Sequence, residues 1–177
     1  MSGHNKYSKI KHKKALTDAK KSKMFSKFSR LITLESQKAG GNISSPALDN
    51  AIKKAREVNM PNDSIDRAVK KGITDKEDSL EPITYEGYGP GGCALIIDTL
   101  SSNRNKTAQE IKHTFSKNGF ALAVPGSASW AFNKTLGEGW VPHTHIQISE
   151  EDGKILETLI EELEENDDVQ EVYTNAE

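Results

Sequence analysis

The sequence predicts an α+β protein, in which a basic three-helix domain precedes an acidic domain built on one antiparallel sheet. Three observations indicate this class. Apolar residues recur with helical spacing before residue 72 and with strand-like spacing after residue 81, and the charge changes sign over the same stretch. From Gly92 onward, the elements follow the order strand, helix, strand, strand, helix, strand, which is the ferredoxin-like split βαβ arrangement. We therefore expect a helical domain at 1–72, a linker at 73–81 and a sheet domain at 82–177.

The net charge of −2 hides two opposite halves. Residues 1–72 carry 17 Lys and Arg against 6 Asp and Glu, whereas residues 73–177 carry 7 against 20. The first thirty residues hold ten Lys and Arg and a single acid, Asp18. This asymmetry predicts an arm that binds a polyanion, joined to an acidic body. The alternative is a solvated helical face that the other half of the molecule balances.

Three helices are expected in the basic half. The first covers roughly 14–38 and ends at Gly40 and Gly41, and the second begins at Pro46 in a first-turn position. The third is short and closes with Gly72 as its C-cap. Each helix has one apolar face, so the three form a small bundle. The second and third resemble a helix-turn-helix pair, although any compact helix pair has such a turn.

The segments 82–88 and 93–100 predict two strands joined by Gly-Pro-Gly-Gly into a hairpin, with 82–88 added to the split βαβ sheet. Gly87, Gly89 and Gly92 match the dinucleotide-binding pattern G-x-G-x-x-G. That pattern requires a helix after the glycines, whose amino-terminus holds the pyrophosphate. A strand is expected there instead, so a dinucleotide site is not predicted.

Two helices and three strands are expected in the remainder of the chain. A helix begins near Asn103, strands follow at 126–132 and 141–148 around a turn at 133–139, and a helix and a strand end the chain at 150–167 and 169–175. Arg104 and Lys106 stand at the electropositive start of the first of these helices, which favours phosphate binding. A capping turn with an incidental pair of cations is the alternative.

No catalytic constellation, cofactor site or metal site is predicted. His143 and His145 point to one side of an expected strand, but no carboxylate or Cys stands at a matching spacing. Cys93 lies in an apolar run and is the single cysteine of the sequence. A disulfide within the chain is therefore excluded, and a reducing compartment is favoured. No segment has membrane-spanning length or the features of a secretory signal, so a cytoplasmic protein without a membrane partner or a small-molecule substrate is expected.

Five segments resemble successive signatures of the YebC/PmpR family, the bacterial relatives of the mitochondrial translational activator of cytochrome oxidase subunit one. They are MSGHNKYSKIKHKKALTDAKKSKMFSK, NMPNDSIDRAVKKG, YEGYGPGG, SSNRNKT and DDVQEVYTN. The resemblance implies a helical domain followed by α/β domains, a cytoplasmic location and no enzymatic activity. Its members are described as DNA-binding transcriptional regulators, and part of the family is associated with the ribosome and the synthesis of proline-rich segments. Typical members also insert a third domain where this sequence has only a short turn, between about 133 and 140.

The expected function is therefore that of a non-enzymatic nucleic-acid-binding regulator of gene expression. DNA-binding transcription regulation follows the family's description, whereas a lysine-rich arm with Arg30 as its only arginine suits shape-led RNA binding and translation regulation, with the ribosome as a partner. A protein-interaction adaptor is the alternative from another class. The nucleic-acid-binding residues that we predict are Lys6, Tyr7, Lys9, Lys11, His12, Lys13, Lys14, Lys20, Lys21, Lys23, Lys27, Arg30, Arg104 and Lys106.

Overall fold

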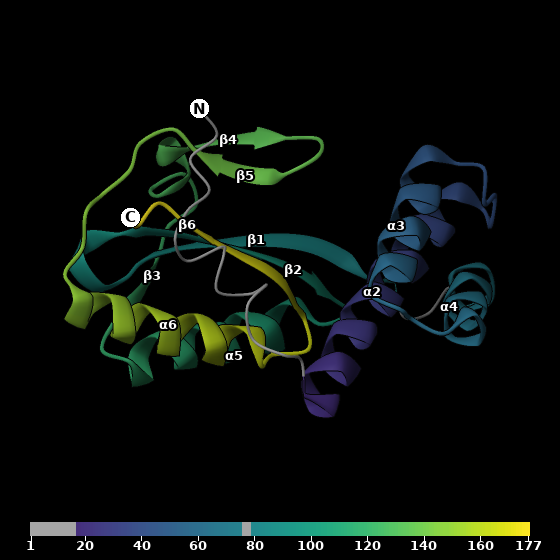
Figure 1. The fold of residues 1–177 in the computed structure, drawn as a ribbon, viewed down its shortest axis with the longest axis horizontal. Helices are drawn as coiled ribbons and strands as arrows, with labels where there is room; N and C mark the ends of the chain where they lie inside the picture. The colour runs from purple at the N-terminus through teal and green to yellow at the C-terminus, as the bar shows by residue number, and fades with distance from the viewer. Residues whose placement is uncertain (1–16, 76–78) are drawn as a thin grey trace. The chain divides into compact units, whose positions relative to one another are not determined.

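The computed structural model describes residues 17–75 and 79–177, which form two compact units (Figure 1). Residues 100–102 group with the helical unit, which otherwise ends at residue 81, and the remaining described residues form the sheet unit. Helices come first and an antiparallel sheet follows, so the predicted α+β class is confirmed. None of the described helices has the length and hydropathy needed to cross a membrane.

The helical unit contains α2 (Asp18–Ala39), α3 (Pro46–Glu57) and α4 (Asn62–Thr74). Thr17 caps α2 by accepting a hydrogen bond from the backbone N of Lys20, and the left-handed backbone of Gly40 ends the helix. Pro46 occupies the first turn of α3, as predicted. Local sequence signals therefore set most of the boundaries of these helices.

The core of the helical unit is made by one apolar face from each helix. Ile32 of α2, Leu48 of α3 and Ile65 of α4 are each no more than 2 % exposed. Small polar side chains bring α2 and α4 together: Thr33 Oγ1 donates to the backbone O of Ala68 at 3.2 Å, and Ser36 Oγ donates to that of Val69 at 2.7 Å. The two helices therefore approach closely along a seam of short side chains.

Gly72 belongs to this seam, and its predicted role as a C-cap is wrong. Helix α4 continues to Thr74, and Asp75 is its C-cap. Gly72 is buried inside the last turns of α4, where an added Cβ would lie 2.5 Å from the backbone O of Thr33 and 2.9 Å from the backbone N of Gln37. The absence of a side chain permits the contact between the two helices.

Replacing Gly72 with Ala is expected to destabilise the protein by about 1–3 kcal/mol, because the new methyl group overlaps backbone atoms that cannot move separately from α2. Helix propensity alone predicts the opposite sign, since Ala is favoured over Gly by about 1 kcal/mol inside a helix. Urea unfolding measures the change. Gly137→Ala is the control, because its added Cβ meets no atom within 4 Å. Stabilisation by Gly72→Ala would contradict the close approach of the helices.

The sheet unit contains four strands in the order β3-β1-β2-β6. They are β1 (Glu81–Tyr88), β2 (Ala94–Ser101), β3 (Ala121–Ala123) and β6 (Val169–Thr174). Strand β1 lies inside the sheet, between β3 and β2. A short turn at Pro90–Gly92 leads into β2, so a strand follows the glycine pattern, as the sequence predicted.

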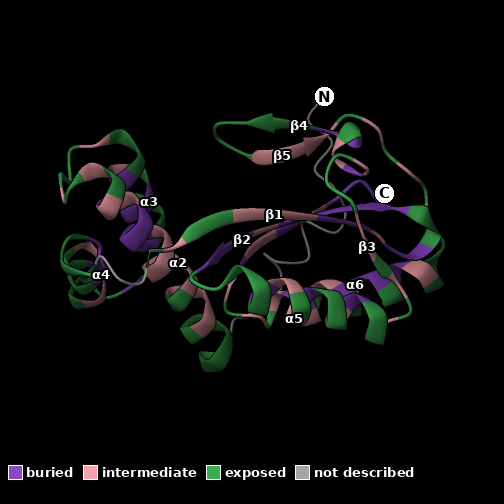
Figure 2. Ribbon diagram, turned by 180° about the vertical axis from the view of Figure 1, so that it is seen from behind, coloured by how far each residue is buried: buried purple, intermediate pink, exposed green. Residues whose placement is uncertain are grey.

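Both faces of this sheet are covered. Helices α5 (Arg104–Lys117) and α6 (Glu150–Glu164) lie on one face, and the hairpin of β4 (Phe132–Thr135) and β5 (Gly139–Pro142) lies on the other (Figure 1). Residues of β2 alternate between the two cores: Leu95 and Ile97 join the helix side, whereas Ala94 and Ile96 join the hairpin side. Strand β2 is therefore buried along nearly its whole length (Figure 2).

Two strand predictions in this unit are corrected. Residues 126–131 form a turn and a short 3-10 helix, and β4 begins only at Phe132. Strand β5 ends at Pro142, and an isolated bridge pairs Ile146 with Ala176. The three-residue β3 was not predicted, because three residues are too few to show a periodicity of two. The outer strand next to β1 is therefore β3.

Candidate nucleic-acid interface

Seven of the predicted contact residues lie outside the described residues, and their roles stay predictions. They are Lys6, Tyr7, Lys9, Lys11, His12, Lys13 and Lys14. The other seven lie on α2 and at the start of α5.

Helix α2 arranges four of its cations in a line, which we call the basic stripe: Lys20, Lys23, Lys27 and Arg30. Steps of three, four and three residues place them on one face of a helix, because side chains three or four positions apart are neighbours. Lys21 lies off this stripe. Lys20 and Lys21 are exposed, and neither side chain has an ion-pair or hydrogen-bond partner in the described part of the chain. The start of α2 thus presents positive charge to solvent.

Arg30 ends the stripe and is anchored by the backbone. Its Nη1 donates a 2.8 Å hydrogen bond to the backbone O of Leu100, which belongs to the same compact unit. This hydrogen bond orients the guanidinium, which has five N–H donors in all. The position of this positive charge is therefore fixed more firmly than that of an exposed lysine.

Further cations lie exposed on α3 and α4. Lys38, at the end of α2, pairs with the partly buried Glu35. Lys53 of α3 pairs with Asp49, and both side chains are exposed to solvent, so this pair contributes little to stability. For the five others on α3 and α4, the structure gives the side chains no ion pair within the described ranges; they are Lys54, Arg56, Arg67, Lys70 and Lys71. Among these, Arg67 donates hydrogen bonds to Asp63 O and Ser64 Oγ. The helical unit therefore presents a surface that attracts anions.

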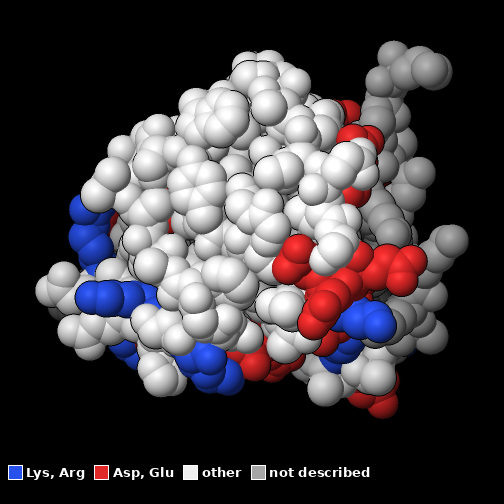
Figure 3. Space-filling model, turned by 90° about the vertical axis from the view of Figure 1, so that its left-hand side faces the viewer, with Lys and Arg blue, Asp and Glu red and all other residues white. Residues whose placement is uncertain are grey.

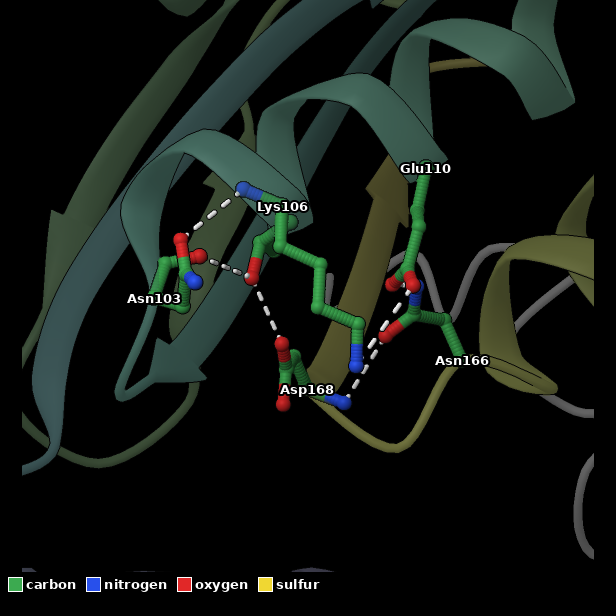
Figure 4. A network of polar contacts seen from close by, with 6 residues as sticks. Asn103, Lys106, Glu110, Asn166 and Asp168 are labelled. Carbon is green, nitrogen blue, oxygen red and sulfur yellow. Dashed lines mark hydrogen bonds and ion pairs between the residues drawn. The ribbon is translucent and has the colours of Figure 1, made fainter. Parts of the chain in front are cut away.

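Arg104 and Lys106 do begin α5, as predicted, but the end of this helix is occupied by groups of the chain itself (Figure 4). Asn103 is the N-cap, and its Oδ1 accepts a hydrogen bond from the backbone N of Lys106 at 3.1 Å. The ammonium group of Lys106 lies 3.7 Å from Glu110 Oε1. The predicted capping turn is therefore present.

The loop before β6 completes this polar network. Thr107 Oγ1 donates to Asp168 Oδ2 at 2.5 Å, and Asn166 Nδ2 donates to Glu110 Oε2 at 2.8 Å. Figure 4 shows the carboxylates of Glu110 and Asp168 on the same side of α5 as the Lys106 side chain. Carboxylates beside a helix amino-terminus compete with any incoming phosphate. These residues therefore connect α5 to the loop before β6 through hydrogen bonds. The phosphate site at Arg104 and Lys106 stays a prediction.

Glu86 is a buried carboxylate that sequence reasoning missed. It is 7 % exposed, and its two oxygens accept hydrogen bonds from the backbone N of Gly126, Ala128 and Ser129 at 2.7, 2.7 and 2.8 Å. Burial by itself raises the pKa of this carboxyl group, but the hydrogen bonds outweigh it, so the pKa of Glu86 is lowered from its usual 4.5. The sequence signal that could have indicated a buried carboxylate is a glutamate among the β-forming residues of the 82–88 strand.

The loop held by Glu86 presents an exposed aromatic ring. Trp130 is 56 % exposed, yet its Nε1 donates to Tyr88 Oη at 3.0 Å, and that hydroxyl donates to the backbone O of Ser127. The indole is therefore held in one orientation on the surface of the sheet unit.

Other candidate chemistry in the sheet unit is sparse. His143 and His145 follow β5 in a loop, so the prediction that both lie on a strand is wrong. Across residues 17–75 and 79–177, no group of three or more His, Cys, Asp or Glu side chains is placed to hold a metal ion. Cys93 is fully buried, and burial raises the pKa of its thiol.

Acidic side chains gather on one part of the sheet unit's surface (Figure 3). The first turn of α6 carries Glu150, Glu151 and Asp152. At the carboxyl end of α5, the Asn118 amide and the Lys117 ammonium hold the pKa of Glu162 below its usual value. This unit has the opposite electrostatic character to the helical unit.

Comparisons with known proteins find similarity along nearly the whole chain. The profile of the TACO1/YebC protein N-terminal domain matches residues 5–75, and that of the TACO1/YebC second and third domain matches residues 80–138 and 134–176. The chain belongs to the TACO1/YebC family. A relative from Petrotoga mobilis, named a probable transcriptional regulatory protein, is 43% identical over 100% of this chain and 71% of its own length.

Two further relatives extend the comparison. A family member from Thermoanaerobacter pseudethanolicus, also named a probable transcriptional regulatory protein, is 35% identical over 239 aligned positions, which cover 97% of its length. Because this chain has 177 residues, the relative carries a segment that this chain lacks. The crystal structure of a conserved hypothetical protein from Aquifex aeolicus has a TM-score of 0.84 at 31% identity, covering 95% of each chain. This chain and the Aquifex aeolicus protein therefore share one fold.

Proposed function

We propose that this chain is a non-enzymatic regulator of gene expression that binds nucleic acid through its basic helical unit. The exposed cations of this unit that have no anionic partner in the described structure carry the proposal, together with the ten Lys and Arg of the first thirty residues. Such a surface supplies the phosphate contacts that dominate affinity for nucleic acids. The names of the relatives support transcription as the process that is regulated, and a regulator of transcription has DNA as its first candidate polymer.

Lysine-rich composition supports RNA as a second candidate. Base-specific readout in a DNA groove uses Arg, Asn or Gln, whereas the predicted arm has mostly Lys, which contacts phosphates as a point charge. Folded RNA is recognised largely by shape, which suits such contacts. A role in translation at the ribosome follows from this candidate. The cytoplasmic location implied by the family resemblance stays a prediction.

A retardation assay with duplex DNA, structured RNA and ribosomes tests both candidates at salt concentrations of about 50 and 200 mM. We expect retention of at least one polymer at the lower salt and a steep loss at the higher, because each neutralised phosphate adds about 0.9 to the salt slope on duplex and about 0.7 on single strands. The polymer bound most tightly at the higher salt identifies the target class. Retention of none of them at low salt would contradict the proposal and favour the protein-interaction adaptor.

A further inference from the structure

A cavity of about 160 Å³ opens beside the middle of α2. Its lining residues come from α2, from the last turns of α4, from the segment before β1 and from the residue that follows β2, and all of them belong to the helical unit. They are Ser29, Arg30, Thr33, Lys71, Leu80 and Ser102.

The lining has the chemistry of an oxyanion site. It contains a guanidinium, an ammonium and three hydroxyl groups, and none of its described residues is a carboxylate. Guanidinium and ammonium groups bind phosphate through charge-assisted hydrogen bonds, which are stronger than those between neutral groups. At about 160 Å³ the cavity is smaller than the 300–1,000 Å³ typical of drug-sized ligands, so it suits a group of few atoms.

Two of the lining side chains are fixed before any ligand arrives. The hydrogen bond to Leu100 O orients Arg30, and the hydrogen bond to Ala68 O orients Thr33, which is 7 % exposed. Lys71 is exposed, and its ammonium group has no partner in the described part of the chain. The hydroxyls of Ser29 and Ser102 likewise have no hydrogen-bond partner there. The single hydroxyl proton of Thr33 is therefore already used, whereas Arg30 has further N–H donors besides the one that orients it. The donors of the cavity are thus one oriented guanidinium, the Lys71 ammonium and the two serine hydroxyls.

We propose that this cavity binds one phosphate group of the nucleic acid, with Arg30 and Lys71 as the charged contacts. The proposal rests on the proposed function and assigns one defined contact to it. The basic stripe supports this assignment: Lys20 to Arg30 spans ten residues of α2, or about 15 Å at 1.5 Å per residue, and ends at the cavity. The basic stripe thus places basic side chains along α2 up to the proposed phosphate-binding site.

Titration of the full chain with inorganic phosphate, followed by amide ¹H–¹⁵N shifts, tests the cavity without any nucleic acid. We expect saturable shifts at Ser29, Thr33, Lys71 and Ser102 that sodium chloride at equal ionic strength does not produce. Shifts spread evenly over all exposed lysines, or equal shifts with chloride, would overturn the site.

The substitution Lys71→Gln tests the same contact in the complex, and Lys70→Gln is its matched control. Both lysines are exposed, adjacent on α4 and without partners in the described structure, but only Lys71 lines the cavity. On duplex DNA, we expect Lys71→Gln to lower the salt slope by about 0.9. Raising the salt from 50 to 200 mM should then weaken the binding of this variant by a factor that is about 3-fold to 4-fold smaller than for wild type. Lys70→Gln is expected to lower the slope by clearly less than Lys71→Gln, because Lys70 belongs to the same basic surface but does not line the cavity.

The two proposals fail in different ways. If a polymer is retained but both variants lower its salt slope equally, the cavity is not a phosphate seat, although nucleic-acid binding stands. If no polymer is retained but inorganic phosphate still shifts the cavity residues in wild type and not in Lys71→Gln, the proposed function fails, and the site binds a small oxyanion instead. Unchanged thermal unfolding of both variants shows that either result reports binding and not folding.

Discussion

Replacing Lys11, Lys13 and Lys14 together with Ala is expected to give the largest loss of nucleic-acid binding of any triple substitution in this chain. Three lost phosphate contacts lower the salt slope by about 2.7 on duplex DNA or about 2 on single strands. Raising the salt from 50 to 200 mM should therefore weaken the binding of the variant to duplex DNA by a factor that is roughly 40-fold smaller than for wild type. Retardation assays over a salt series measure this change.

A control with the same loss of charge separates contact from net charge. Lys112, Lys117 and Lys154 belong to the sheet unit, where Lys117 pairs with Glu162 at 3.1 Å near the surface. Their replacement with Ala should leave the salt slope almost unchanged. The proposal predicts nearly unchanged thermal stability for the arm variant. A large loss of stability would mean that the arm lysines hold the protein together instead of contacting phosphates.

Replacing Glu86 with Ala is expected to have the largest effect on stability, a loss of about 2–4 kcal/mol in urea unfolding. Three backbone N–H groups of the 126–129 loop lose their acceptor. The Ala128 N–H is buried, and leaving a buried donor unpaired costs about 1–3 kcal/mol, whereas water can replace part of the other two hydrogen bonds, which are only partly buried. Glu86→Gln should lose less, because one amide oxygen remains to accept from Ala128 and Ser129. Near-equal stability of wild type and Glu86→Ala would show that the loop does not depend on this carboxylate.

The same carboxylate predicts a dependence on pH. Because the folded protein lowers the pKa of Glu86 below its usual 4.5, the ionised form stabilises the fold at neutral pH. This contribution is present above the usual pKa and is lost as the pH falls through the lower, folded value. Subtracting the stability of Glu86→Gln from that of wild type at each pH isolates the effect from the other carboxylates. The difference should be constant near neutral pH and shrink below about pH 4.5.

Local patterns were sufficient to predict elements whose boundaries depend on nearby residues. The apolar spacing and terminal glycines of α2, the Pro46 start of α3 and the hairpin of β1 and β2 are all signals within a few residues of the element that they define. The charge asymmetry between the halves is likewise a property of composition. The family resemblance likewise implied a helical domain followed by α/β domains.

Local patterns misled where a distant contact decides the conformation. The 126–131 segment alternates like a strand, but three of its N–H groups bond to Glu86, some forty residues earlier, and so are not available to a ladder. Gly72 has the identity of a C-cap, whereas its actual role depends on the backbone of α2, which lies about forty residues away.

The sequence by itself determined the helices of the basic half, the α+β class and the separation of charge, because propensity, periodicity and composition are properties of neighbouring residues. Tertiary structure alone decided that β1 lies inside the sheet, that β2 is buried on both faces and that Lys71 joins Arg30 at one cavity. The physical reason is that these features arise from groups far apart in the chain, whose meeting depends on how complete faces pack and not on any local preference.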